Sequence, residues 1–400
     1  ASQTPAGLGL YRGSEFTITP TYLLENSKST YLGQPSKDHT TNLGIGNLGL
    51  VTSYNSRRTE GIVGITVAFG YNMLNNFHSS IRMEGINNQS SFLDNFTSYA
   101  NDRPELNMFY DELAHQTALM PLDPASNSYW HYLEPYEAYE GYGEEQLRVV
   151  ERRGHVGEYV VSAALNFDHK LYLGGTFGLH SVRFYEDMYH RETDVDNLED
   201  NFDTFSFGEY NSTRGYGYVF KVGMIYKPIH ALRIGASFHV PVVYQLTDEK
   251  FTELNAYWDS DSGLSDGYAS SGPEPKDYSL RTPYRASLSA ALLLGKLGLI
   301  SAEYEYVDYS TSDLDSPGKR FSVENSIISK DFEVAHNLKA GAEFRLNPVY
   351  LRAGAQYYMN PFTDKRNGSD IWVYSGGIGL RSNQTFIDIA YSLSMRSDLY

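Results

Sequence analysis

The stretch that decides the fold is LRIGASFHVPVVY, residues 232–244. Its even-numbered positions, from Leu232 to Tyr244, are all apolar, whereas most of its odd-numbered positions are polar or small. Neighbouring side chains of a β-strand point to opposite sides of the sheet, so this period of two predicts a strand with one apolar face.

The same alternation recurs along most of the chain, most clearly at 216–226, 284–292, 300–306, 338–344, 351–357 and 387–393. Such runs are longer than the usual strand of about five or six residues, and they match the roughly 9 to 11 residues that a tilted strand needs to cross a bilayer. Many apolar faces also end in an aromatic residue, as a girdle at a membrane interface does. A soluble β-sandwich has alternating strands too, but these features favour a membrane barrel.

The connections between the predicted strands alternate between short and long. Short turns fall at 168–169, 227–230, 295–296, 347–348 and 382–384, and long polar segments at 186–212, 248–276 and 311–330. Short turns at one end and long loops at the other are typical of a Gram-negative outer-membrane barrel. We therefore expect a multi-pass β-barrel in the cell outer membrane, with long extracellular loops.

Thirteen strands are predicted, at 14–25, 38–54, 59–74, 155–168, 170–185, 213–227, 229–247, 278–294, 296–310, 331–346, 348–360, 370–382 and 384–398. Single-chain bacterial barrels close with an even number of strands. The expected fold is an all-β transmembrane antiparallel barrel of about 14 strands, of which 13 are visible in this chain.

Composition excludes several other classes of protein. The 400 residues carry a formal net charge of −17 and no cysteine, which argues against nucleic acid as a partner and removes thiol chemistry. The longest apolar run, 286–295, is about half of what a membrane-spanning helix needs. His180 and His239 lack a second ligand at metal spacing. We expect no catalytic residue, no metal and no cofactor.

The opening residues TPAGLGLY, 4–11, followed by SEFTITP, 14–20, resemble the FadL/TodX family of outer-membrane channels for hydrophobic compounds. Members carry Asn-Pro-Ala-Gly just before the first strand, and here Thr4 stands first, so the match is Pro5, Ala6 and Gly7. The resemblance implies that this motif ends an N-terminal hatch inside the barrel. Residues 1–13 would be the end of that hatch, most of which is then absent from this chain, and 14–400 would be the barrel.

The resemblance also implies a route for the ligand. A hydrophobic molecule would be captured outside, enter the lumen and leave sideways through the wall where a strand is kinked. Gly44, Gly46 and Asn47 are the candidate kink, because they interrupt the alternation and permit a bulge. A cluster of glycines at a barrel corner is the alternative interpretation.

Residues 75–154 form a segment far too long for a structureless loop, and we expect a partly helical extracellular lid. A helix is predicted to begin at Asp102, and an earlier turn or two near Phe92. The candidate substrate-binding residues are the apolar ones of this segment: Phe92, Phe96, Leu106, Phe109, Leu113, Trp130 and Tyr132. Alternatively, each of these side chains only packs the lid onto the barrel rim.

The expected function is passive uptake of a hydrophobic small molecule or lipid, by resemblance a long-chain fatty acid or similar compound. Outer-membrane lipid and lipopolysaccharide are expected to surround the barrel, and other outer-membrane proteins are further candidate partners. One alternative is a barrel that serves as scaffold or shuttle in a protein-secretion or surface-assembly complex. A general porin for polar solutes is another.

Overall fold

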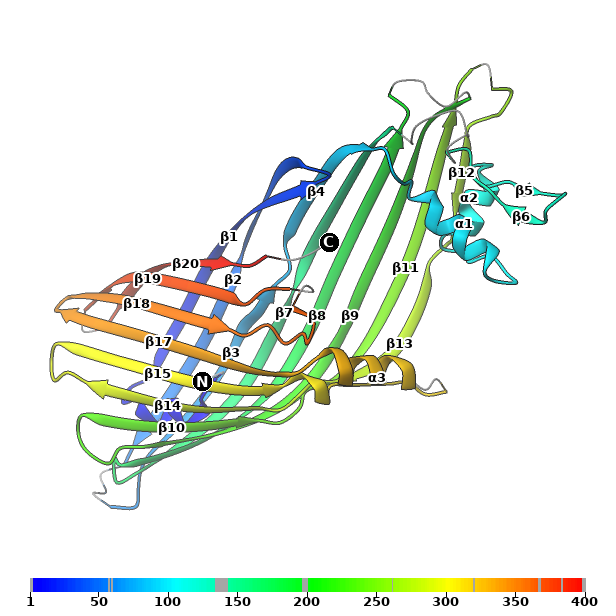
Figure 1. The fold of residues 1–400 in the computed structure, drawn as a ribbon. Coiled ribbons are helices and arrows are strands. Elements are labelled where there is room, and N and C mark those ends of the chain that lie inside the picture. Colours follow the sequence, from blue (N-terminus) through cyan, green and yellow to red (C-terminus); the bar gives the residue numbers. More distant parts are fainter. Residues whose placement is uncertain are drawn as a thin grey trace.

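The computed structural model describes residues 3–56, 58, 60–133, 143–195, 201–260, 262–318, 321–365, 368–382 and 384–397. Within these residues, eighteen strand segments form a single antiparallel sheet that curves into a barrel wall (Figure 1). A separate two-stranded sheet and three short helices are not part of that wall. The all-β barrel predicted from the alternation is confirmed.

The segments of the wall are β1 (Glu15–Tyr31), β2 (Gln34–Asn55), β3 (Ile62–Asn76), β4 (Ser79–Asn87), β7 (Glu144–Phe167), β8 (Leu171–Thr193), β9 (Phe202–Tyr226), β10 (Leu232–His239), β11 (Val243–Trp258), β12 (Gly267–Ser270), β13 (Glu274–Arg281), β14 (Arg285–Leu293), β15 (Gly298–Asp308), β16 (Asp313–Asp315), β17 (Val334–Leu346), β18 (Val349–Tyr358), β19 (Ile371–Arg381) and β20 (Phe386–Met395). The remaining elements are η1 (Pro5–Leu10), α1 (Leu93–Asn101), α2 (Asp111–Gln116), β5 (Leu122–Asp123), β6 (Ser128–Tyr129), η2 (Tyr309–Thr311) and α3 (Ser322–Asp331).

These segments make thirteen passes in the described part of the chain. Strands β3 and β4, β10 and β11, β13 and β14, and β15 and β16 are halves of single passes, and β12 is a short strand that only pairs with the end of β11. Each pass pairs with the next one along the chain, from β1 to β20. The two edge strands approach each other where Arg396 Nη2 lies 3.5 Å from Glu25 Oε1.

One side of the barrel is much taller than the other. Strands β7, β8 and β9 have 24, 23 and 25 residues, whereas β14, β15 and β17 to β20 have 9 to 13. At about 3.3 Å per residue, the long strands reach far beyond a bilayer. In Figure 1 they rise towards α1 and α2. Strands thus extend further into the predicted lid than expected, at both its ends, and 134–142 lie outside the described residues.

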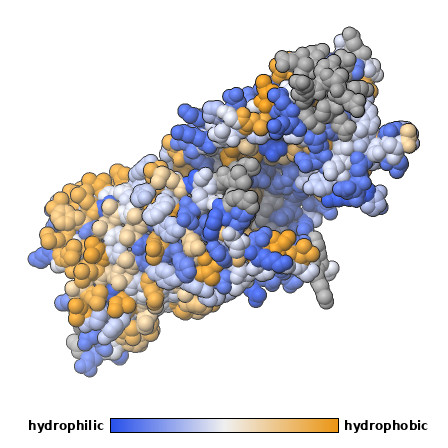
Figure 2. All heavy atoms as spheres, in the orientation of Figure 1, coloured by the Kyte–Doolittle hydropathy of each residue, from blue (hydrophilic) through white to orange (hydrophobic). Residues whose placement is uncertain are grey.

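An apolar outer surface covers the end of the barrel that carries the short turns, and the end with the helices is hydrophilic (Figure 2). On β9 the six alternate side chains from Tyr216 to Tyr226 are 41 to 48% exposed and point outward. Lipid is the solvent that suits such a surface. No helix in the described ranges has the length and hydropathy needed to cross a membrane.

The stretch 229–247 was predicted as one strand, but it is broken between β10 and β11. Pro241 has no N–H for the ladder, and there Val242 N donates instead to Thr282 Oγ1 at 3.0 Å. The break reverses the alternation. Phe238 faces outward as predicted, whereas Tyr244, predicted on the same face, points inward to His180, with 2.6 Å between its hydroxyl and Nδ1.

The prediction that a helix begins at Asp102 is wrong. Asp102 instead ends α1, where its N–H donates to Ser98 O at 3.1 Å. The next helix, α2, begins only at Asp111, because the intervening residues around Pro104 leave the helical path. The earlier turn predicted near Phe92 is α1 itself.

Candidate functional site

The lid helices pack onto the tall wall through an apolar cluster. Its centre joins α1 and α2 to β9 and β11, and its largest fully buried members include Leu93, Leu113, Phe205, Phe207 and Leu254. Burying an apolar side chain of this size stabilises the folded state by about 1.5 to 3 kcal/mol. The cluster therefore fixes α1 and α2 against the inner face of β9 and β11.

The candidate substrate-binding residues fall into three groups. Phe96 and Leu113 are buried in the cluster, where they pack lid against wall. Phe92, Leu106 and Tyr132 lie at its margin and are partly exposed, as is Phe109. Trp130 is exposed and packs against Tyr132 with the two rings tilted and their centroids 4.8 Å apart. A role in binding stays a prediction for all seven.

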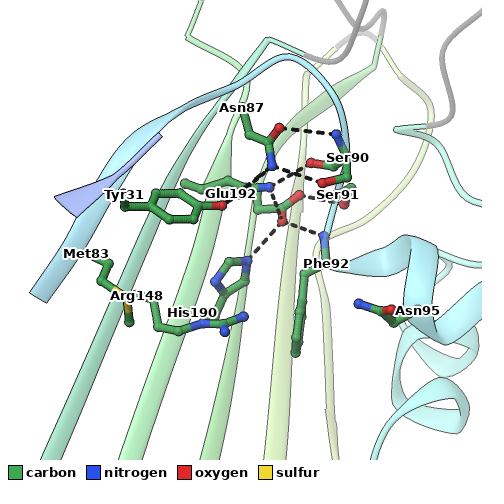
Figure 3. A pocket seen from close by; sticks show the side chains of 11 residues that line it. Tyr31, Met83, Asn87, Ser90, Ser91, Phe92, Asn95, Arg148, His190 and Glu192 are labelled. Atoms are coloured by element: carbon green, nitrogen blue, oxygen red, sulfur yellow. Dashed lines mark hydrogen bonds and ion pairs between the residues drawn. The ribbon is translucent and has the colours of Figure 1, made fainter. Parts of the chain in front are cut away.

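A cavity of about 190 Å³ lies where the chain enters α1 (Figure 3). Phe92 is the one candidate residue that lines it, and the other walls come from β1, β4, β7 and β8. Its lining is mixed: Met83 and Phe92 are apolar, while Arg148, His190 and Glu192 are ionisable.

Glu192 anchors the start of α1 to the wall. Its carboxylate is fully buried and accepts hydrogen bonds from Ser91 Oγ at 2.6 Å, Phe92 N at 2.7 Å, Gln146 Nε2 at 2.8 Å and His190 Nε2 at 2.9 Å (Figure 3). A buried carboxylate is tolerated only when donors surround it. Two of these donors belong to the lid and two to the wall.

His190 is held as a neutral imidazole. Burial lowers its pKa below the ordinary 6.5, and the hydrogen bond to Glu192 only partly opposes this. Since Nε2 donates to Glu192, the neutral ring leaves Nδ1 without a proton, which fits the lack of a described partner for that buried atom.

Acidification should loosen the lid. The pKa of His190 is lower when the lid is closed than when it is open, so the open state binds the proton more tightly. The closed lid therefore has its full stability above about pH 6.5. That stability declines as the pH falls below this value, and the decline ends once the pH is below the pKa of the closed state. Thermal melting followed by tryptophan fluorescence should show the decline between about pH 7.5 and pH 5.5. In His190→Gln, which keeps a donor for Glu192, this part of the dependence should vanish. An equal slope in both proteins would contradict the assignment.

Arg148 lines the same cavity from β7. Its guanidinium lies over the Phe92 ring, 5.1 Å from the centroid, and its Nε is buried with no hydrogen-bond partner in the described residues. Burial lowers the pKa of Arg148, and the nearby Tyr31 and Glu192 oppose that effect. An arginine remains charged even so, and the cavity therefore holds a cation with unused donor capacity.

A second cavity of about 210 Å³ lies further from α1 along β7 and β8, and it shares Met83 and Arg148 with the first. Two ion pairs lie beside it, Arg152 Nε to Glu186 Oε2 at 2.5 Å and Lys250 Nζ to Glu209 Oε1 at 3.0 Å. No group of three His, Asp or Glu side chains able to hold a metal ion occurs among the residues described.

The barrel wall is interrupted between β2 and β3. Their ladder runs from Asn55–Gly64 to Asn47–Asn72 and is not continued beyond that pair in the described residues. Both strands bulge there: the register of β2 with β1 shifts at Gly46, opposite Pro20, and that of β3 with β7 shifts at Leu74. We call this region, residues 42–47 of β2 and 72–76 of β3, the wall break.

Asparagine side chains bridge the wall break at both ends. At the lower end, Asn47 Nδ2 donates to Asn72 Oδ1 at 2.8 Å, and at the upper end Asn76 Nδ2 donates to Asn42 Oδ1 at 3.2 Å. Between them β2 alternates glycine with exposed apolar residues: Leu43, Gly44, Ile45 and Gly46. A Cβ at Gly44 would find only Asn42 Oδ1 within 4 Å, at 3.7 Å. The candidate kink residues thus lie in the wall break; their role remains a prediction.

Above the wall break, the β1–β2 hairpin rejoins the wall through side chains. Its turn at Leu32 and Gly33 has positive φ at both residues, as a tight hairpin requires. Ser27 Oγ donates to Ser80 O of β4 at 2.6 Å, and Ser29 Oγ donates to Arg82 O. The hairpin therefore contributes Tyr31 to the first cavity, the one at the start of α1.

The motif residues Pro5, Ala6 and Gly7 open η1, which lies against the inner wall. Its neighbours are β3, β7, β8 and β9. A Cβ at Gly174 of β8 would lie 2.5 Å from Pro5 C, so only glycine permits this approach. Leu8 is buried among Val51, Ala68 and Ala164.

Comparison with protein-family models decides what the chain is. The model described as outer membrane protein transport protein (OMPP1/FadL/TodX) matches residues 199–399, half of the chain. The chain belongs to this family. As a FadL/TodX family member it is an outer-membrane transport protein and not an enzyme, so the predicted resemblance and location are confirmed.

Solved structures similar to this FadL/TodX family member share its fold. A FadL homologue from Pseudomonas aeruginosa has 14% identity and a TM-score of 0.53, over 98% of this chain and 84% of that one. The toluene transporter TodX of Pseudomonas putida has 12% identity and a TM-score of 0.50, over 97% and 86%. A search of curated proteins returned no significant match.

The sequence did not reveal the polar residues of the first cavity and of the wall break: Arg148, His190 and Glu192 in the cavity, and Asn42 and Asn72 in the wall break. The signal available was weak. Arg148, His190 and Glu192 fall on the polar face of their strands, where charged residues that line a wet lumen also fall.

Proposed function

We propose that this family member is a passive channel through which a hydrophobic small molecule enters beneath the lid and leaves sideways through the wall break into the membrane. In this proposal the described residues 88–133, between β4 and β7, form the lid, and η1 narrows the lumen. Outer-membrane lipid and lipopolysaccharide surround the apolar outer surface.

The interrupted ladder between β2 and β3 is the observation that carries the proposal. Backbone groups within a membrane are costly to leave unpaired, so barrels normally pair each strand on both edges. Here two facing bulges and a pair of glycines hold the edges apart, and asparagine amides bridge the ends.

A sideways exit also suits an apolar ligand. Passage through the wet lower lumen would remove it from apolar contact, at about 25 cal/mol for each Å² exposed. Exit through the wall delivers it directly into lipid instead.

Arg148 favours a ligand with an acidic head, such as a long-chain fatty acid. Its guanidinium faces the cavity beside Met83 and Phe92, so a carboxylate and an alkyl chain would each find a partner there. A carboxylate is the group whose geometry an arginine fork matches best.

The test is uptake of a radiolabelled long-chain fatty acid and of toluene by Gram-negative cells that lack other channels of this family. Cells with the wild-type chain should take up the fatty acid faster than cells without it. Arg148→Met should slow fatty-acid uptake about tenfold or more at low concentration, since a hydrogen bond to a charged group contributes about 1.5 to 3 kcal/mol. Toluene uptake should not fall.

Arg183→Met is the matched control, because Arg183 is exposed on the outer face of β8 and should leave uptake unchanged. If the folded wild-type chain accelerated the uptake of neither compound, the channel proposal would be wrong and a scaffold role favoured. Fatty-acid uptake unaffected by Arg148→Met would refute the acidic ligand.

A further inference from the structure

A row of polar side chains runs across the inner wall from the lower end of the wall break. Strand register places Asn47 opposite Asn72, Asn72 opposite Glu158, and Glu158 opposite His180, on four successive strands. Residues directly opposite one another in an antiparallel sheet share a face. These four side chains therefore lie next to one another on the lumen side.

Glu158 and His180 belong to a buried charged cluster. Lys221 Nζ forms an ion pair with Glu158 Oε1, His180 Nε2 lies 3.2 Å from the same oxygen, and the Tyr244 hydroxyl lies 2.6 Å from His180 Nδ1. Glu158 is fully buried. We call Glu158, His180, Lys221 and Tyr244 the charged floor.

Two glycines make room for the charged floor. A Cβ at Gly178 would lie 2.7 Å from Glu158 Oε1, and one at Gly217 would lie 2.5 Å from Tyr244 Cδ1. Side chains at these positions would prevent Glu158 and Tyr244 from lying flat against the wall. The cluster is thus built into the wall and is not a chance pairing of long side chains.

The strands place the charged floor between an apolar surface and η1. Val156, Val182 and Leu246 form the apolar surface; each lies two positions nearer the lid than the charged-floor residue of its strand. This surface reaches the wall break, because Val156 is paired with Asn75. Further towards the short turns, Gly174 of β8 and Gly223 of β9 contact Pro5. A molecule that descends the lumen meets the apolar surface first, beside the wall break, and the charged floor next.

We propose that the charged floor sets the direction of transport: it stops an apolar molecule beside the wall break and makes the sideways exit its most favourable continuation. This inference rests on the proposed lateral exit. To descend further, the molecule would have to lie against a buried ion pair and displace the groups that stabilise it, which an apolar surface cannot replace.

The test removes both charges together, in Glu158→Leu with Lys221→Met, so that neither is left unpaired. The apolar ligand should then settle below the wall break. Cellular uptake of the radiolabelled fatty acid should fall by about tenfold, and the purified protein should bind an apolar fluorescent probe about tenfold more tightly, for some 55 Å² of new apolar contact.

Glu303→Leu with Lys339→Met is the matched control. That ion pair, 2.9 Å between Nζ and Oε1, joins β15 and β17 away from the wall break, and its removal should change neither uptake nor probe affinity. The double variant Glu158→Leu with Lys221→Met could fail to fold, which the gel mobility of the unheated barrel would show. In that case Glu158→Gln with Lys221→Gln tests the same point, with smaller changes of uptake and probe affinity in the same directions.

The outcomes separate this inference from the proposed function. Absence of uptake by the wild-type chain would refute the channel itself. Uptake that Gly44→Trp blocks, but that folded charged-floor variants sustain at the wild-type rate, would overturn the charged floor alone.

Discussion

A tryptophan at position 44 should reduce fatty-acid uptake to the background of cells that lack the chain. Gly44 lies on β2 in the wall break, and a Cβ there would make only an ordinary van der Waals contact with Asn42 Oδ1, at 3.7 Å, so the backbone of the strand can accept a larger side chain. The indole would occupy the place where the β2–β3 ladder is missing. The measurement is the initial rate of fatty-acid uptake, with the amount of folded barrel in the outer membrane determined for each strain.

Gly341→Trp is the control for position 44. Gly341 faces the lumen from β17, which pairs on both edges, and its nearest neighbour is the flexible Ser301 hydroxyl at 3.4 Å. This tryptophan should leave uptake close to wild type. If the uptake rate fell equally in both variants, narrowing of the lumen would explain the loss. If it fell in neither, the wall break would not be the exit.

Replacement of Glu192 by alanine should release the start of α1 from the wall. Four donors lose their shared acceptor at once, among them Ser91 Oγ and Phe92 N of the lid. Hydrogen bonds to a charged group contribute about 1.5 to 3 kcal/mol each, so opening of this end of the lid should increase by about two orders of magnitude or more. Amide hydrogen exchange of residues 92–100 measures it.

Glu151→Ala is the control for Glu192. Glu151 lies on the neighbouring strand β7 but is exposed on its outer face, so exchange in α1 should match the wild type. Protection of α1 that survived Glu192→Ala would mean that the apolar cluster alone holds the lid, and the anchor role of Glu192 would be wrong.

The lid shows why the candidate binding residues were harder to predict than the strands. Phe92, Phe96 and Leu113 look alike in sequence, yet Phe96 and Leu113 are buried against β9 and β11 while Phe92 borders a cavity. What separates them is the position of the tall wall, whose cluster residues lie from 89 positions (Leu113 to Phe202) to 162 positions (Phe96 to Trp258) further along the chain. Local periodicity contains no information about such contacts.

By itself, the sequence determined that the chain is an outer-membrane barrel and in what order its strands cross the membrane. Lipid on one side of each strand and water on the other impose a period of two, and this period is visible in the amino-acid sequence. The tertiary structure alone decided where that rule is broken. Pro241 turns Tyr244 inward to His180, and the bulge at Gly46 ends the pairing of β2 with β3. These positions depend on which strands meet, and hydrogen bonds across the wall fix them only once the barrel has formed.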